Sequence, residues 1–125
     1  HRQWPATLDQ LKALQPQKLV PGRGDALQSA AQCIEAIEGT REFLVTMFET
    51  VKRAKQAGKT LAECYQMAYQ ALAPKHGEWV IFEHCLPFNI ARCYDEAGEH
   101  VDPRIWTSER DQEMWHALQD SLQSV

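Results

Sequence analysis

Two histidines and two cysteines lie near one another in the C-terminal half of the chain, and these residue types bind zinc or act as nucleophiles. They are His84, Cys85, Cys93 and His100. Structural zinc sites take ligands from pairs about two to four residues apart, whereas His84 and Cys85 are adjacent and point in different directions on a helix. A nucleophilic pair of Cys85 with His76 or His100 lacks an activating group beside the thiol. We therefore expect no metal site and no catalytic residue in this segment.

A concentration of aromatic side chains, interspersed with arginines, extends over residues 79–115, which include this segment. The aromatic residues are Trp79, Phe82, Phe88, Tyr94, Trp106 and Trp115, and the arginines are Arg92, Arg104 and Arg110. Such a group forms either a packed core with arginines at its rim or a wall of a substrate pocket for a medium-sized apolar or aromatic acid or ester. Our candidates for a substrate-binding wall are Trp79, His84 and Phe88.

Arg23 is the remaining candidate for a substrate-binding residue, and it lies in the turn Pro21-Gly22-Arg23-Gly24. Its guanidinium group has donors in a fork that matches a carboxylate or a phosphate. The structural alternative is a turn residue that pairs with a nearby acid such as Asp25. The sequence leaves both interpretations open.

The composition is that of a soluble globular domain, with 44% hydrophobic and 24% charged residues. The net charge of −4 comes without a basic cluster, so we expect no nucleic-acid partner. No apolar run approaches the roughly 20 residues that a membrane span needs. The four cysteines are scattered and form no Cys-x-x-Cys pair, which predicts reduced thiols and a cytoplasmic protein.

Hydrophobic periodicity predicts a mainly α fold with four to five helices and one short strand. The expected helices cover residues 4–14, 25–57, 60–73, 79–96 and 107–122, and the strand is Leu19-Val20. The segment Trp79-Val80-Ile81-Phe82 is the exception, since its aromatic and β-branched residues also suit a strand. Gly39 in the second helix predicts a kink or a close helix crossing.

Local signals mark the ends of these helices. Asp25 is a candidate N-cap for the long second helix, and Gly58 is a candidate stop after a basic last turn. Thr60 and Glu63 have the spacing of a capping box, and Pro74 is expected to end the helix that they start. Thr107 or Ser108 is expected to cap the last helix.

The first 25 residues carry a resemblance to a known family. A helix over residues 4–14 leads into Lys18-Leu19-Val20 and then into Pro21-Gly22-Arg23-Gly24. This order resembles the metallo-β-lactamase-fold hydrolases near the end of their catalytic domain, where the turn is Pro-Gly-His-Gly. The resemblance implies that residues 1–25 end the catalytic domain and that residues 26–125 form a C-terminal helical extension.

In that family the histidine of the turn is a zinc ligand, and Arg23 stands at the matching position. A guanidinium has no lone pair for a metal, so the resemblance implies a parent enzyme that lacks one ligand of its second zinc site. The family's His-x-His-x-Asp-His run is absent from this chain. The resemblance thus implies that zinc and the activated water belong to residues upstream of His1. We expect zinc in the parent enzyme and none in this chain alone, which is expected to be inactive.

The function that follows from the resemblance is that of a C-terminal fragment of a zinc hydrolase, which contributes substrate-pocket wall and oligomer contacts. Leu19-Val20 is a single strand without a partner, which predicts either a missing domain or a dimer. Two alternatives remain: a stand-alone helical dimerisation module with the apolar stripe from Leu27 to Val51 as its seam, and a non-catalytic small-molecule-binding domain.

Overall fold

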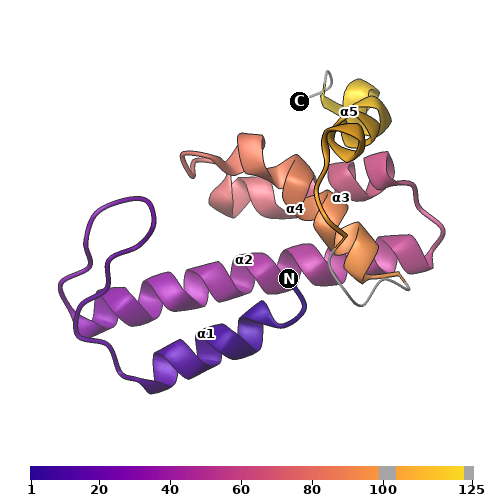
Figure 1. The fold of residues 1–125 in the computed structure, drawn as a ribbon. Helices are drawn as coiled ribbons and strands as arrows, with labels where there is room; N and C mark the ends of the chain where they lie inside the picture. Colours follow the sequence, from indigo (N-terminus) through magenta and orange to yellow (C-terminus); the bar gives the residue numbers. More distant parts are fainter. Residues whose placement is uncertain (99–103, 123–125) are drawn as a thin grey trace. The chain divides into compact units, whose positions relative to one another are not determined.

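The computed structural model describes residues 1–98 and 104–122, and in these residues the fold is mainly α, as the periodicity predicts (Figure 1). The helices in chain order are α1 (Trp4–Ala13), α2 (Ala30–Gln56), α3 (Leu61–His76), α4 (Phe82–Glu96) and α5 (Ser108–Leu122). None of them is long and apolar enough to cross a membrane.

The chain divides into two compact units, with the division inside α2. The first, which we call the N unit, comprises residues Gln3–Val45. The second, the C unit, comprises His1–Arg2 together with Thr46–Val125. The prediction that residues 1–25 end a catalytic domain and residues 26–125 extend it stays a prediction.

In the N unit, α1 is tied to the first half of α2. Leu8 of α1 is buried, and Nε of Arg41 donates to Oδ1 of Asp9 at 2.9 Å. A second ion pair joins Lys12 to Glu38. Both pairs are largely exposed, so they fix the orientation of α1 more than they stabilise the unit.

The predicted strand Leu19-Val20 is an isolated bridge, and its partner lies within the chain. Leu19 and Leu27 exchange both backbone hydrogen bonds, at 3.1 and 2.8 Å. The prediction that this segment needs a second copy or a missing sheet is therefore wrong for Leu19, because its N–H and C=O groups are paired. Between the two leucines the turn reverses through Gly24, whose φ of +90° favours glycine.

Helix α2 begins at Ala30, five residues after the predicted cap Asp25. The cause is the bridge, which keeps Leu27 in extended backbone. Ser29 caps the helix instead, since its Oγ accepts from the backbone N–H of Gln32 at 3.3 Å. At Gly39 no atom from another described segment lies within 4 Å of the position of a Cβ, so the described residues make no close crossing there. The alternative of a kink at Gly39 stays a prediction. The end of α2 at Gln56 before Gly58, with φ of +77°, is as predicted.

The capping box predicted at the start of α3 is confirmed. The backbone N–H of Glu63 donates to Oγ1 of Thr60 at 3.3 Å, and the N–H of Thr60 donates to Oε2 of Glu63 at 2.9 Å. The predicted end at Pro74 is wrong, because α3 continues to His76. A proline removes one donor from the helix, and the N–H of Gly77 still pairs with the carbonyl of Ala73 at 2.9 Å.

We expect Thr60→Ala to lower the free energy of unfolding by about 1 kcal/mol, because it leaves the N–H of Glu63 without its partner. Urea denaturation followed by circular dichroism measures the change. Gln66→Ala, at an exposed position of the same helix, is the control and is expected to change stability little. Equal stability of the two variants would contradict the role of the cap.

The core of the C unit lies between α3, α4 and α5, which pack against one another. Its fully buried side chains include Tyr65, Leu72, Leu86, Ile90 and Leu118. Residues 79–81 form neither the predicted helix nor the alternative strand, but a turn that precedes α4. Pro87 is inside α4 without ending it. Thr107 caps α5, because its Oγ1 accepts from the backbone N–H of Arg110 at 3.3 Å.

Candidate functional site

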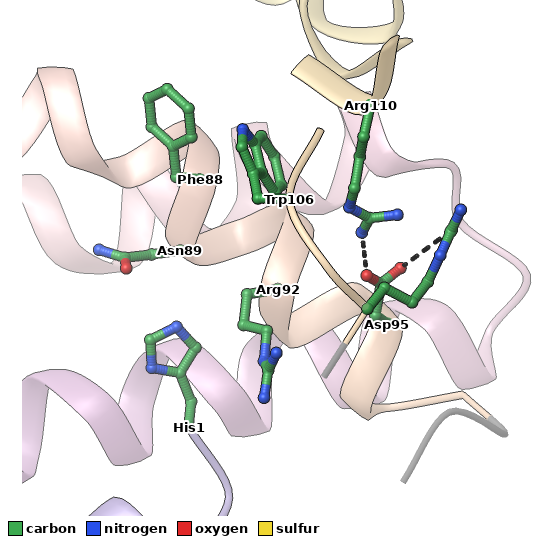
Figure 2. Close-up of a pocket in the computed structure, with 8 residues that line it drawn as sticks. His1, Phe88, Asn89, Arg92, Asp95, Trp106 and Arg110 are labelled. Carbon is green, nitrogen blue, oxygen red and sulfur yellow. Dashed lines mark hydrogen bonds and ion pairs between the residues drawn. The ribbon is translucent and has the colours of Figure 1, made fainter. Parts of the chain in front are cut away.

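The C unit contains an open cavity of about 330 Å³ between α4 and the segment that enters α5 (Figure 2). Aromatic, cationic and amide side chains line it together with one carboxylate. The lining residues are His1, Phe88, Asn89, Arg92, Asp95, Arg104, Trp106 and Arg110.

Helical spacing brings half of these residues together. Phe88, Arg92 and Asp95 are four and three positions apart, so they lie on one face of α4, with Asn89 next to Phe88. The other side of the cavity comes from Arg104 and Trp106, which precede α5, and from Arg110 in its first turn. The site therefore depends on α5 packing beside α4.

The aromatic part of the lining is a cluster of rings around Phe88. Its ring centroid lies 5.4 Å from that of Trp106 and 5.9 Å from that of Trp115. His84 lies one turn earlier on α4, with its ring 6.1 Å from Phe88. The side chain of Trp106 remains 40% exposed, so it presents an uncovered aromatic surface at the cavity.

Asp95 organises the basic part of the lining. Its carboxylate forms an ion pair with Arg110, and Nη1 of Arg104 lies 4.0 Å from its Oδ1 (Figure 2). The side chains of Asp95 and Arg110 are only 14% and 11% exposed, whereas that of Arg104 is 48% exposed. The guanidinium carbon of Arg110 also lies 5.3 Å from the ring centroid of Trp106. Arg110 is thus held between a carboxylate and an aromatic ring.

Glu96 forms an ion pair with Arg92, the remaining arginine of the lining. Its carboxylate pairs with Nε of Arg92 and accepts from the backbone N–H of Arg2 at 2.8 Å and from the amino group of His1 at 2.7 Å. Burial by itself would raise the pKa of Glu96, but these hydrogen bonds outweigh it and lower the pKa to about 2. Glu96 is therefore ionised at neutral pH and keeps Arg92 in place.

Two buried polar atoms at this cavity have no hydrogen-bond partner among the described residues. They are Nδ1 of His1 and Nε of Arg110, and both residues belong to the lining. Buried polar groups in folded proteins are nearly always paired with protein, water or ligand. Because both atoms are fully buried, neither is open to a molecule in the cavity.

The residues proposed from sequence fall in different places. Phe88 lines the cavity, and His84 contacts Phe88 without lining it. Trp79 packs edge-on against His76, with ring centroids 4.5 Å apart, and is not part of the lining. Arg23 is exposed in the loop of the N unit. The structure therefore groups only His84 and Phe88.

Sequence reasoning did not select Asn89, Asp95 or Trp106 as site residues, and it placed Arg92, Arg104 and Arg110 only at a rim. The spacing of Arg92 and Asp95 from Phe88 was a usable signal for the half of the site on α4. Trp106 and Arg104 lie in a segment without periodicity, so no sequence pattern connects them to α4.

In the described part of the chain, no group of three or more His, Cys, Asp or Glu side chains is arranged to hold a metal ion. His100 lies outside the described residues. All four cysteines are free, and burial raises the pKa of Cys93 to about 12 and also raises that of Cys64. Cys33 is buried as well, which leaves Cys85 as the partly accessible thiol.

We expect one thiol per folded chain, that of Cys85, to react rapidly with dithionitrobenzoate, because a buried thiol is shielded and rarely ionised. Absorbance of the released thiolate gives the count, which rises to four after unfolding. Cys85→Ser should abolish the rapid phase, and Cys33→Ser is the matched control that should retain it. A rapid phase that survives in the Cys85→Ser variant would contradict the burial of the others.

This chain matches no protein-family model and no curated protein.

Proposed function

We propose that this chain is the C-terminal part of a metallo-β-lactamase-like zinc hydrolase and that its C-terminal helices form a wall of the substrate pocket. The cavity beside α4 carries the proposal, because it combines an uncovered aromatic surface with three arginines. Support for the family comes from the sequence alone, in which residues 4–14, Lys18-Leu19-Val20 and the Pro-Gly-Arg-Gly turn follow one another.

In this proposal the zinc ion and the activated water belong to residues upstream of His1. The described residues of this chain do not fit a zinc ion, since no suitable group of ligands is present among them and Arg23 cannot donate a lone pair. The part that this chain plays is therefore substrate binding: Phe88 and Trp106 supply apolar contact, and the arginines attract negative charge. Alone, the chain does not catalyse hydrolysis.

Oligomer contacts and a cytoplasmic location also belong to this proposal. Trp4, Leu11 and Leu14 are exposed on and just after α1, and an apolar surface of this kind favours self-association as a dimer. The bridge at Leu19 is no longer an argument for a partner strand. Four free thiols favour a reducing compartment.

A non-catalytic binding domain is the second candidate function, and the same cavity favours it because the C unit supplies every lining residue. The helical dimerisation module has less support. Its proposed seam on α2 includes Ile37, Leu44, Met47 and Val51, and all four are buried within the single chain. A stripe that is already covered is not available to a second copy.

The reading frame upstream of His1 tests the proposal. We expect it to encode a His-x-His-x-Asp-His run, and we expect the longer protein to bind zinc and to hydrolyse a model ester or amide. Chelation should abolish turnover, and added zinc should restore it. A longer protein without that run, or one whose turnover survives chelation, would overturn the hydrolase and leave the binding domain.

A further inference from the structure

We propose that the cavity beside α4 binds a small aromatic carboxylate, with its ring against Trp106 and its carboxylate at the arginines of the lining. The inference names the ligand class of the wall described above. It rests on the proposed function only where it calls this ligand a substrate, because the binding itself needs residues of the C unit alone.

The charges of the lining favour an anion. Arg92 and the amino group of His1 share the carboxylate of Glu96, and Arg104 and Arg110 share that of Asp95. Positive charge is therefore left uncompensated among these groups, although the whole chain has a net charge of −4. A carboxylate in the cavity reduces this surplus.

The donors of Arg104 favour a carboxylate as the anion. The side chain of Arg104 is 48% exposed, whereas the Nε of Arg110 is fully buried and is not open to a molecule in the cavity. The flat, two-oxygen shape of a carboxylate matches the donor fork of Arg104.

The aromatic surface and the size of the cavity define the rest of the ligand. Phe88 meets Trp106 at an interplanar angle of 58°, so the two rings are tilted and the indole keeps an open surface. A volume of about 330 Å³ lies at the small end of ligand pockets, which suits a molecule with one or two rings. Offset stacking on tryptophan is worth about 1 kcal/mol beyond the area that it buries.

Phenylacetate is the probe for this inference, and isothermal titration calorimetry on the full chain measures its dissociation constant. We expect saturable binding that is about tenfold tighter than that of phenylacetamide, which keeps the ring but not the charge, and of acetate, which keeps the charge but not the ring. Equal binding of phenylacetamide, or equal binding of inorganic phosphate, would overturn the carboxylate as the ligand.

Two variants with matched controls locate the binding. Trp106→Leu should weaken phenylacetate binding about tenfold, whereas Trp79→Leu should not, although Trp79 and Trp106 are similarly exposed at 44% and 40%. Arg104→Gln should weaken it by a similar factor, and Arg53→Gln, an exposed arginine of α2, should leave it unchanged. Unchanged binding in both cavity variants would overturn the site.

Phenylacetate binding can be tested separately from the zinc hydrolase activity of the proposed function. Trp106 and Arg104 lie outside the helices, and thermal unfolding of each variant tests whether the C unit is intact. Binding of phenylacetate by a chain without an upstream zinc motif would support this inference and overturn the hydrolase. A zinc hydrolase whose C unit does not bind phenylacetate would support the proposed function and overturn this inference.

Discussion

Glu96→Gln is expected to lower the free energy of unfolding by about 3 kcal/mol at neutral pH, because it removes one partner of a buried ion pair. The side chain of Glu96 is 6% exposed, and it pairs with Arg92 and with the backbone N–H of Arg2. Glutamine keeps the shape and one acceptor, but it leaves the charge of Arg92 without compensation. Urea denaturation followed by circular dichroism measures the loss.

The same variant should change how stability depends on pH. The pKa of Glu96 is about 2 in the folded chain against an ordinary value of 4.5, so the ionised form is favoured by folding. Its contribution is complete above about pH 4.5 and is lost as the pH falls toward about 2. The difference in stability between the wild type and Glu96→Gln should therefore shrink in acid.

An exposed carboxylate provides the control for this experiment. Glu78 lies in the turn after α3 and is exposed, so Glu78→Gln should change stability by less than about 0.5 kcal/mol. If Glu96→Gln were as stable as Glu78→Gln at neutral pH, Glu96 would not hold Arg92 at the cavity. The arrangement of charges that favours an anionic ligand would then fail as well.

Helices and their ends were predictable where the signal is local. The capping box of Thr60 and Glu63 uses groups three residues apart, and Gly58 ends α2 through its own backbone conformation. Local signals were misleading where a residue distant in the sequence determines where a helix begins. Asp25 has the chemistry of an N-cap, but the bridge from Leu19 holds Leu27 extended and moves the start of α2 to Ala30.

The candidate site was predictable only in part, for the same reason. Phe88 was selected from an aromatic-rich segment, and helical spacing places Arg92 and Asp95 beside it. Trp79 was selected from the same segment, yet it packs on His76, because the turn after α3 directs it there. Trp106 reaches Phe88 through the packing of α5 beside α4, which no spacing in the sequence encodes.

Leu86→Ala is expected to lower the free energy of unfolding of the C unit by about 3 kcal/mol, which is typical when a buried leucine is cut back to alanine. Leu86 has no exposed surface, and it lies in the half of α4 that precedes the cavity residues. Removing its side chain loses buried apolar area and leaves a void where α4 packs against its neighbours. Urea denaturation and thermal unfolding both report the change.

Val80→Ala is the control for Leu86→Ala, because Val80 is 93% exposed and should lose less than about 0.5 kcal/mol on truncation. The comparison also bears on the cavity. The packing that buries Leu86 fixes α4, and α4 in turn holds Phe88, Arg92 and Asp95 on one face. A Leu86→Ala variant as stable as Val80→Ala would mean that α4 is not anchored by its core, and these three residues would then lose their common position.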